Sequence, residues 1–171
     1  DEVGKQQARA AAERLRDAKL DRIIVSPLPR TRQTADFVNQ YHCAPIDVHE
    51  DIADIRSGFD GRAVGEYFAA TAHDPLKARV NGGESLGDHY ERVCACLEGL
   101  AQGGADQLLL VAHEETLRVF RAWADKNPLD LQLVVLMFCE NDVADNNARV
   151  RNDKPKPKFE LIDNNLVLTG V

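Results

Sequence analysis

Two stretches of the chain share one layout: RIIVSPLPRTRQTADFV at residues 22–38 and QLLLVAHEETLRVF at residues 107–120. Each begins with a short apolar run, passes through a polar turn, and continues with apolar residues at helical spacing. This order predicts a buried strand followed by a helix, twice. Arg30 and His113 occupy the two turns. Because ligands of open parallel sheets bind beyond the carboxyl ends of the strands, both side chains are expected at one site.

The rest of the chain continues the alternation of strands and helices. Ser85 and Asp88 form the pattern of a capping box, which predicts a helix that starts there and ends at Gly103 and Gly104. Alternation of this kind favours an α/β fold: a three-layer sandwich with a mostly parallel central sheet and helices on both faces, in a single domain over 1–171. The other predicted elements are strands at 45–48 and 131–139, helices at 2–18, 31–40, 63–72 and 114–125, and a terminal hairpin around Asn164–Asn165.

The composition excludes several classes of protein. A chain of 171 residues, 44% hydrophobic and with a net charge of −7, has a core of its own but lacks the positive surface that nucleic acid binding requires. No apolar run approaches the roughly 18 residues of a membrane-spanning helix, and no signal peptide opens the chain. The four cysteines, Cys43, Cys94, Cys96 and Cys139, have neither disulfide-scaffold density nor zinc-site spacing. We expect them to be reduced and mostly packed in the core of a cytoplasmic protein.

The residue types in the two turns indicate a phosphate pocket. An arginine presents a fixed fork of donors that fits phosphate oxygens, and a histidine can donate or accept protons near neutral pH. Each turn also opens a helix, whose N-terminal backbone N–H groups favour an anion. A nucleotide-binding α/β domain is the alternative on these grounds. Neither Gly-x-Gly-x-x-Gly nor Gly-x-x-x-x-Gly-Lys-Ser/Thr occurs in the chain, however.

Four segments resemble the motifs of the histidine phosphatase superfamily, also called phosphoglycerate mutase-like. SPLPRTRQTA (26–35) is similar to its Ser-x-Leu-x-Arg-Ala-x-Gln-Thr-Ala signature, and GGESLGDHYERV (82–93) to its Gly-Glu-Ser stretch. LLLVAHEETLRVF (108–120) resembles the strand and second catalytic histidine, and DEVGKQQA (1–8) the start of the first helix. The order and spacing agree over roughly residues 1–123.

The resemblance implies phosphoryl transfer through a phosphohistidine, without a metal or an organic cofactor. Arg30 would hold phosphate oxygens, and His113 would donate a hydrogen bond to the same phosphoryl group. Asp54 in IADIRSGFDG is the candidate acid for the leaving oxygen, with Glu50 as the alternative. Glu114 would contribute to substrate binding through the start of its helix. With Glu115 it replaces the family's small residues, so both carboxylates are expected to point outward.

Two other polar residues near these motifs are given structural roles. Ser26 lacks the Gly-x-Ser-x-Gly elbow of a nucleophilic serine, so we expect a turn hydrogen bond. His89 lies inside the helix that follows the Gly-Glu-Ser stretch, and it is expected on the surface or in the core.

The family's nucleophile is missing from these 171 residues. It lies in an Arg-His-Gly triplet after the first strand, and none of the five histidines follows such a sequence. The chain starts at Asp1, and its only methionine is Met137, so we expect the nucleophilic strand upstream of this chain. The resemblance places that strand in the middle of the sheet, where its absence would leave two rows of backbone groups unpaired.

The favoured interpretation is a phosphatase for a small phosphorylated metabolite, with inorganic phosphate as a second ligand of the site. A catalytically inactive pseudophosphatase that binds phosphorylated ligands or protein partners is the first alternative. A phosphoglycerate mutase is the second, but it is disfavoured by Gln33 before Thr34 and by the short segment between residues 61 and 81. The oligomeric state, including a homodimer, stays open.

Overall fold

The computed structural model describes residues 2–104 and 107–127, and beyond them only the strands between residues 132 and 169. The helices are α1 (Glu2–Arg14), α2 (Pro29–Asn39), a 3-10 turn η1 (Glu50–Ile52), α3 (Val64–Thr71), α4 (Leu86–Gln102) and α5 (Glu114–Ala124). The strands are β1 (Arg22–Val25), β2 (Ile46–Val48), β3 (Gln107–Ala112), β4 (Gln132–Met137), β5 (Val150–Arg151), β6 (Lys154–Pro155), β7 (Lys158–Ile162) and β8 (Asn165–Thr169).

The first four strands form one parallel sheet. Their order is β2-β1-β3-β4, so that β1 and β3 lie at its centre. Ile23 of β1 is paired with Ile46 of β2 on one side and with Leu109 of β3 on the other. Each crossover between parallel neighbours runs through a helix, as parallel pairing requires. The predicted mostly parallel α/β sheet is confirmed.

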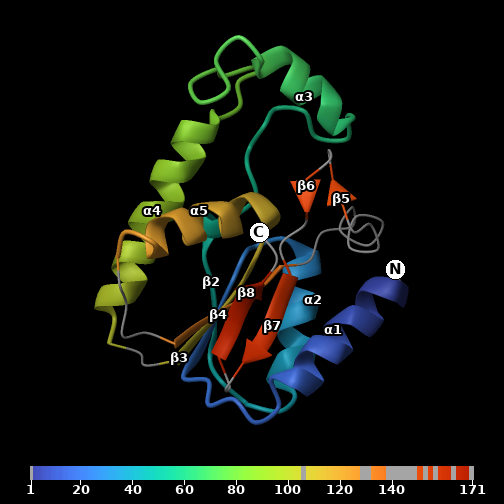
Figure 1. Cartoon of the computed structure of the whole chain (residues 1–171), viewed down its shortest axis with the longest axis vertical. Coiled ribbons are helices and arrows are strands. Elements are labelled where there is room, and N and C mark those ends of the chain that lie inside the picture. The colour runs from blue at the N-terminus through green and yellow to red at the C-terminus, as the bar shows by residue number, and fades with distance from the viewer. Residues whose placement is uncertain are drawn as a thin grey trace.

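Alternate residues of the central strands fill two separate cores. Ile23 and Val25 of β1 face a cluster that also contains Ala12 of α1 and Val38 of α2. Ile24, between them in sequence, faces the opposite cluster, to which α4 and α5 contribute. Figure 1 shows α1 and α2 on one side of the sheet and α4 and α5 on the other. The predicted three-layer sandwich is therefore confirmed, and the core residues follow the period of two of a strand.

Two helix boundaries differ from the prediction by more than one residue. α2 begins at Pro29 and not at Thr31, because proline at the first helical position loses no backbone hydrogen bond there. α1 ends at Arg14, four residues before the predicted end at Ala18. The predicted capping box of α4 is present, with the Ser85 hydroxyl accepting from the amide of Asp88.

The edge of β3 away from β1 is paired with β4, and Leu109 lies opposite Val134. The expectation of two unpaired rows of backbone groups in the middle of the sheet is therefore wrong for this structure. The sheet is continuous because β4, a run of apolar residues after α5, pairs in parallel with β3. The predicted terminal hairpin is confirmed as β7 and β8, which pair antiparallel.

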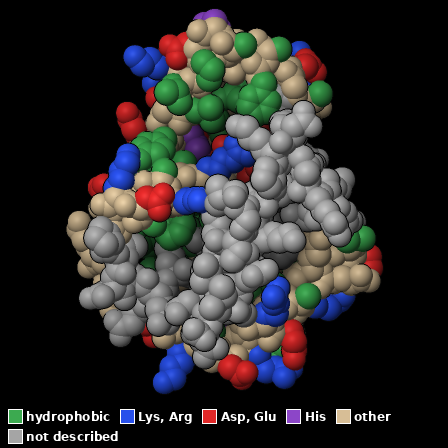
Figure 2. All heavy atoms as spheres, in the orientation of Figure 1, with side chains coloured by type: hydrophobic (Ala, Val, Ile, Leu, Met, Phe, Trp, Pro, Cys, Tyr) green, Lys and Arg blue, Asp and Glu red, His purple; other side chains and the backbone are tan. Residues whose placement is uncertain are grey.

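The cysteines and the surface complete the description. Cys43, Cys94 and Cys96 are free thiols; Cys94 and Cys96 pack, partly buried, against the core as expected, whereas Cys43 is exposed. Cys139 lies outside the described residues. Exposed apolar side chains gather over and beside α3, where Phe68 is 52% exposed and Leu76 is 66% exposed (Figure 2). None of the described helices is both long enough and apolar enough to cross a membrane.

Candidate active site

The carboxyl ends of β1 and β3 lie at the same level of the sheet. Val25 is paired with Val111, and the amide of Ser26 donates to the carbonyl of Val111 at 3.0 Å. The hydroxyl of Thr31 donates to the carbonyl of Ser26 at 2.9 Å and so closes the turn before α2. The register of the two strands thus brings the first residues beyond them, Ser26 and His113, into contact.

Arg30, His113 and Asp54 meet at this edge. The Nη2 of Arg30 donates to the Oδ2 of Asp54 at 3.0 Å, and it lies 3.0 Å from the Nδ1 of His113. The Nδ1 of His113 is 3.7 Å from the same Asp54 oxygen. Arg30 is the second residue of α2, His113 is the N-cap of α5, and Asp54 follows η1. Three separate strand-end connections therefore supply the predicted trio.

Asp54, and not Glu50, contacts the other two residues. The Oδ1 of Asp54 accepts the amide of Ile55 at 2.9 Å, which leaves Oδ2 facing Arg30 and His113. Glu50 is exposed at the start of η1. Of the two carboxylates considered from the sequence, the structure brings Asp54 into the site.

The hydrogen bonds of His113 determine its tautomer. Because a guanidinium can only donate, the Nδ1 of His113 accepts from Arg30. The remaining proton of the neutral ring then sits on Nε2, which donates to the Oγ of Ser26 at 2.6 Å. Burial lowers the pKa of His113 to about 4; the charge of Asp54 opposes this shift, and the charges of Arg30 and His89 add to it. His113 is therefore neutral at pH 7. The sequence predicted a turn bond for Ser26 and did not reveal this partner.

The two glutamates that open α5 turn away from this trio. The Oε1 of Glu114 lies 2.5 Å from the Nη2 of Arg118, and the Oε1 of Glu115 lies 3.3 Å from its Nη1. Both carboxylates therefore lean along their own helix.

A sequence profile of the histidine phosphatase superfamily (branch 1) matches residues 1–136. The chain belongs to the histidine phosphatase superfamily. Phosphoserine phosphatase 1 of Hydrogenobacter thermophilus is 32% identical over 126 residues, which make up 68% of this chain and 60% of that protein. The chain thus spans less than two thirds of the length of this relative.

Solved structures of the superfamily share the fold. Mycobacterial glucosyl-3-phosphoglycerate phosphatase superposes with a TM-score of 0.61 at 26% identity, over 76% of this chain and 69% of that one. This relative has also been solved with inorganic phosphate and with vanadate. The α-ribazole phosphatase of Shigella flexneri superposes with a TM-score of 0.64 at 18% identity, over 97% of this chain and 80% of that one.

A second buried polar cluster joins the Gly-Glu-Ser stretch of this superfamily member to α4. The carboxylate of Glu84 pairs with Arg92, whose Nη2 lies 2.9 Å from the Nδ1 of His89. Burial alone would raise the pKa of Glu84, but hydrogen bonds from Arg92 and from the Arg56 amide lower it overall. His89 is 1% exposed, and burial lowers its pKa. The sequence placed His89 on the surface or in the core; it lies in the core, one turn before Val93 on the same buried face of α4.

Helix α3 lies close enough to Glu84 and Glu115 for their charges to act on Tyr67. Burial raises the pKa of Tyr67 on α3, and the charges of Glu115 and Glu84 raise it further. The hydroxyl of Tyr67 is buried, and among the described residues it has no hydrogen-bond partner. The helix therefore carries a buried polar group near the charged residues Glu84 and Glu115.

The site contains no metal-ligand cluster, and it is separate from the cavity between α4 and the sheet. Among the described residues, no three histidine, cysteine, aspartate or glutamate side chains are grouped as metal ligands.

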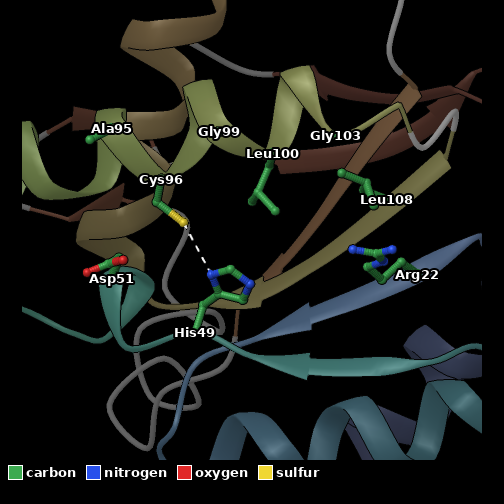
Figure 3. A pocket seen from close by; sticks show the side chains of 9 residues that line it. All are labelled: Arg22, His49, Asp51, Ala95, Cys96, Gly99, Leu100, Gly103 and Leu108. Atoms are coloured by element: carbon green, nitrogen blue, oxygen red, sulfur yellow. Dashed lines mark hydrogen bonds between the residues drawn. The ribbon is translucent and has the colours of Figure 1, made fainter.

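A cavity of about 270 Å³ is lined by residues such as Arg22, Leu100 and Leu108, and in it the Nδ1 of His49 lies 3.7 Å from the Sγ of Cys96 (Figure 3). None of the residues of the Arg30 site lines this cavity.

Proposed function

We propose that this chain is the larger part of a phosphoric monoester hydrolase that works through a phosphohistidine. The observation that supports this most strongly is the contact of one Arg30 nitrogen with both His113 and Asp54. A cation, a neutral imidazole and a carboxylate then surround one point at the carboxyl edge of a parallel sheet, where a phosphoryl group would be held. The nucleophilic histidine of this proposal lies outside the 171 residues.

The residues present would share the reaction as follows. Arg30 turns from Asp54 to the phosphoryl oxygens and stabilises the charge that develops on them in the transition state. The nucleophilic nitrogen forms a bond to phosphorus while the ester oxygen leaves with a proton from Asp54. Water then attacks phosphorus, Asp54 takes the proton of that water, and the histidine is released with inorganic phosphate.

His113 would bind the phosphoryl group after gaining a proton. In the structure its Nδ1 accepts from Arg30 and faces Asp54. A dianionic ligand in place of the Asp54 contact favours the imidazolium form, because a nearby negative charge raises the pKa of a histidine. The Nδ1 proton would then be donated to a phosphoryl oxygen.

The names of the relatives support a substrate class. The named relatives act on phosphoserine, on glucosyl-3-phosphoglycerate and on α-ribazole phosphate, according to their names. We propose a small phosphorylated metabolite for this protein, with inorganic phosphate as product. A location in the cytoplasm accords with such a substrate.

A catalytically inactive phosphate-binding protein is the second candidate. The absence of an Arg-His-Gly triplet from these residues favours it, since His113 and Arg30 suffice to bind phosphate without turnover. The two candidates differ in one measurable product, the phosphohistidine.

The deciding experiment begins with the intact mass and the N-terminal sequence of the natural protein. That protein is then incubated with a radiolabelled phosphate ester, and acid-labile, base-stable label on histidine is measured. We expect label on a histidine upstream of Asp1 and none on the 171-residue chain alone. The variant Arg30→Lys should lower the labelling rate by about 100-fold, because lysine lacks the planar fork. A natural protein that binds phosphate but acquires no label would establish the second candidate instead.

The role of Asp54 as the acid is tested with two substrates that differ in their leaving group. An aryl phosphate releases a phenolate that leaves without protonation, whereas an alkyl phosphate requires a proton on its leaving oxygen. Asp54→Asn should therefore lower kcat for an alkyl phosphate by about 100-fold or more and change kcat for 4-nitrophenyl phosphate by less than about threefold. Equal losses on both substrates would exclude Asp54 as the acid.

A further inference from the structure

The Gly-Glu-Ser stretch lies directly against the segment that carries Asp54. A Cβ on Gly83 would lie 2.4 Å from the carbonyl oxygen of Arg56 and 2.6 Å from the carbonyl carbon of Ser57. Only glycine allows two backbones to approach this closely. The amide of Glu84 donates to the carbonyl of Arg56 at 2.8 Å, and the amide of Arg56 donates to the Oε1 of Glu84 at 2.9 Å. Arg56, two positions after Asp54, is thus hydrogen-bonded to Glu84 through both its backbone amide and its backbone carbonyl.

Arg92 of α4 holds the residues on the other side of Asp54. Its Nη1 donates to the carbonyl of Asp51 at 2.7 Å and to the carbonyl of Ala53 at 3.3 Å. Its Nε lies 3.2 Å from the Oε2 of Glu84, so the two side chains are themselves joined. Each is only 13% exposed, so solvent screens this pair far less than a surface ion pair.

We propose that Glu84 and Arg92 form a clamp that positions the backbone on both sides of Asp54 for proton transfer. The inference rests on the proposed function, in which Asp54 is the acid. Aspartate has a short side chain with two rotatable bonds, so the position of its backbone determines where the carboxyl group can reach. A displacement of about 1 Å is enough to cost about 100-fold in rate when reacting groups must be aligned.

The clamp is made of positioning residues and not of catalytic ones. Neither carboxylate oxygen of Glu84 contacts Arg30 or His113 in the described contacts; the pair reaches the site through the segment 51–56. The hydroxyl of Thr116, on α5, also donates to the carbonyl of Ile52 at 3.5 Å. α4 and α5 therefore both hold the segment, and Arg92 holds it with the shorter hydrogen bonds.

Leaving-group dependence distinguishes positioning from a general loss of stability. In the natural full-length protein, Arg92→Lys removes the fork that reaches Asp51 and Ala53 but keeps the charge opposite Glu84. We expect kcat for an alkyl phosphate to fall by about 10- to 100-fold, and kcat for 4-nitrophenyl phosphate to fall by less than about threefold. Glu84→Gln should give the same pattern. In an Asp54→Asn background, Arg92→Lys should cause no further loss on the alkyl phosphate.

Arg79→Lys is the matched control. Arg79 pairs with Asp88 in the first turn of α4, as Arg92 pairs with Glu84, but it is exposed and donates to no residue of the 51–56 segment in the described contacts. This variant should leave kcat unchanged for both substrates. If Arg92→Lys lowers kcat equally for both substrates, or if kcat falls for neither, the clamp has no positioning role and the inference is wrong.

Amide hydrogen exchange tests the clamp independently of any activity. In the chain itself, exchange at residues 53–56 should accelerate at least about 10-fold in Arg92→Lys and remain unchanged in Arg79→Lys. Unchanged exchange in Arg92→Lys overturns the clamp even in an active enzyme. Accelerated exchange in a protein without phosphatase activity supports the clamp and overturns the proposed function, so the two failures are distinguishable.

Discussion

The Nε2 of His113 lies 2.6 Å from the Oγ of Ser26, and neither residue is more than 1% exposed. Because the Arg30 guanidinium can only donate to the opposite nitrogen, Nδ1, the neutral imidazole carries its proton on Nε2 and donates it to Ser26. The serine that follows β1 therefore accepts the proton of the histidine that follows β3. An imidazole held in this way presents Nδ1 to the site.

Ser26→Ala should leave the Nε2 proton of His113 without its acceptor. We expect the Nε2–H tautomer to persist in the imidazole ¹⁵N spectrum at pH 7, because Arg30 still donates to Nδ1. The lost buried hydrogen bond should also lower the free energy of unfolding by about 1 kcal/mol. Thr34→Ala is the control, since its buried hydroxyl donates to the carbonyl of Arg30 and does not touch His113. A mixture of Nδ1–H and Nε2–H tautomers in Ser26→Ala would contradict the assignment of the proton position to Arg30.

Acid should destabilise the protein through His113. Burial lowers the pKa of His113 in the folded state to about 4, below the ordinary value of 6.5, so the unfolded chain binds more protons between these values. The resulting stability is fully present above pH 6.5, and it is lost as the pH falls from 6.5 to 4. The loss is at most about 3 kcal/mol.

The measurement compares urea unfolding at pH 7.0 and at pH 4.5. The unchanged protein should lose more unfolding free energy over this interval than His113→Gln, which has no imidazole to protonate at this position. His73→Gln, which replaces an exposed histidine, should retain the full loss. Equal losses in all three proteins would contradict the buried neutral state of His113.

The strands and the site were predictable from sequence for the same physical reason. Ile23 to Val25 and Leu108 to Val111 are short, continuous apolar runs, which are typical of strands buried on both faces. If both runs are parallel strands of one sheet, the polar residues directly after them lie at the same edge of that sheet. This geometry predicted a site with Arg30 and His113, whereas the choice of Asp54 over Glu50 required the family resemblance.

The interactions that sequence reasoning missed are those between distant segments without a periodic pattern. The bond from Ser26 to His113 joins residues 87 positions apart, and the bond from Arg92 to Asp51 joins residues 41 apart. The sequence left His89 on the surface or in the core, and the structure buries it with Val93 and Leu97 on one face of α4. No spacing indicates that Arg92 reaches its neutral ring, or that β4 pairs with β3.

Thiol reactivity should separate the described cysteines. Burial raises the pKa of Cys96 to about 11 and also raises the pKa of Cys94, whereas Cys43 is exposed. Since the thiolate is the reactive form, iodoacetamide at pH 7.5 should alkylate Cys43 at least about 100-fold faster than Cys96. Mass spectrometry of the peptides follows each site separately. Comparable rates at Cys43 and Cys96 would show that the cavity beside His49 admits water to the thiol.

Replacement of two different glycines by alanine should change the unfolding free energy in opposite directions. Gly83→Ala places a Cβ 2.4 Å from the carbonyl oxygen of Arg56, so the backbone must move, and we expect a loss of about 3 kcal/mol of unfolding free energy. Gly99→Ala adds its Cβ in the interior of α4 with nothing within 4 Å, and better helix propensity should stabilise the protein by about 0.5–1 kcal/mol.

Thermal unfolding measures both changes. For a chain of this length, we expect Tm to fall by about 6–12 °C in Gly83→Ala and to rise by about 1–4 °C in Gly99→Ala. The two substitutions are chemically identical and lie on either side of the capping box of α4, so a difference in sign isolates the contact with Arg56 and Ser57. If Gly83→Ala has the same Tm as the unchanged protein, the Gly-Glu-Ser stretch does not lie tightly against the Asp54 segment, and the close approach of these two backbones is excluded.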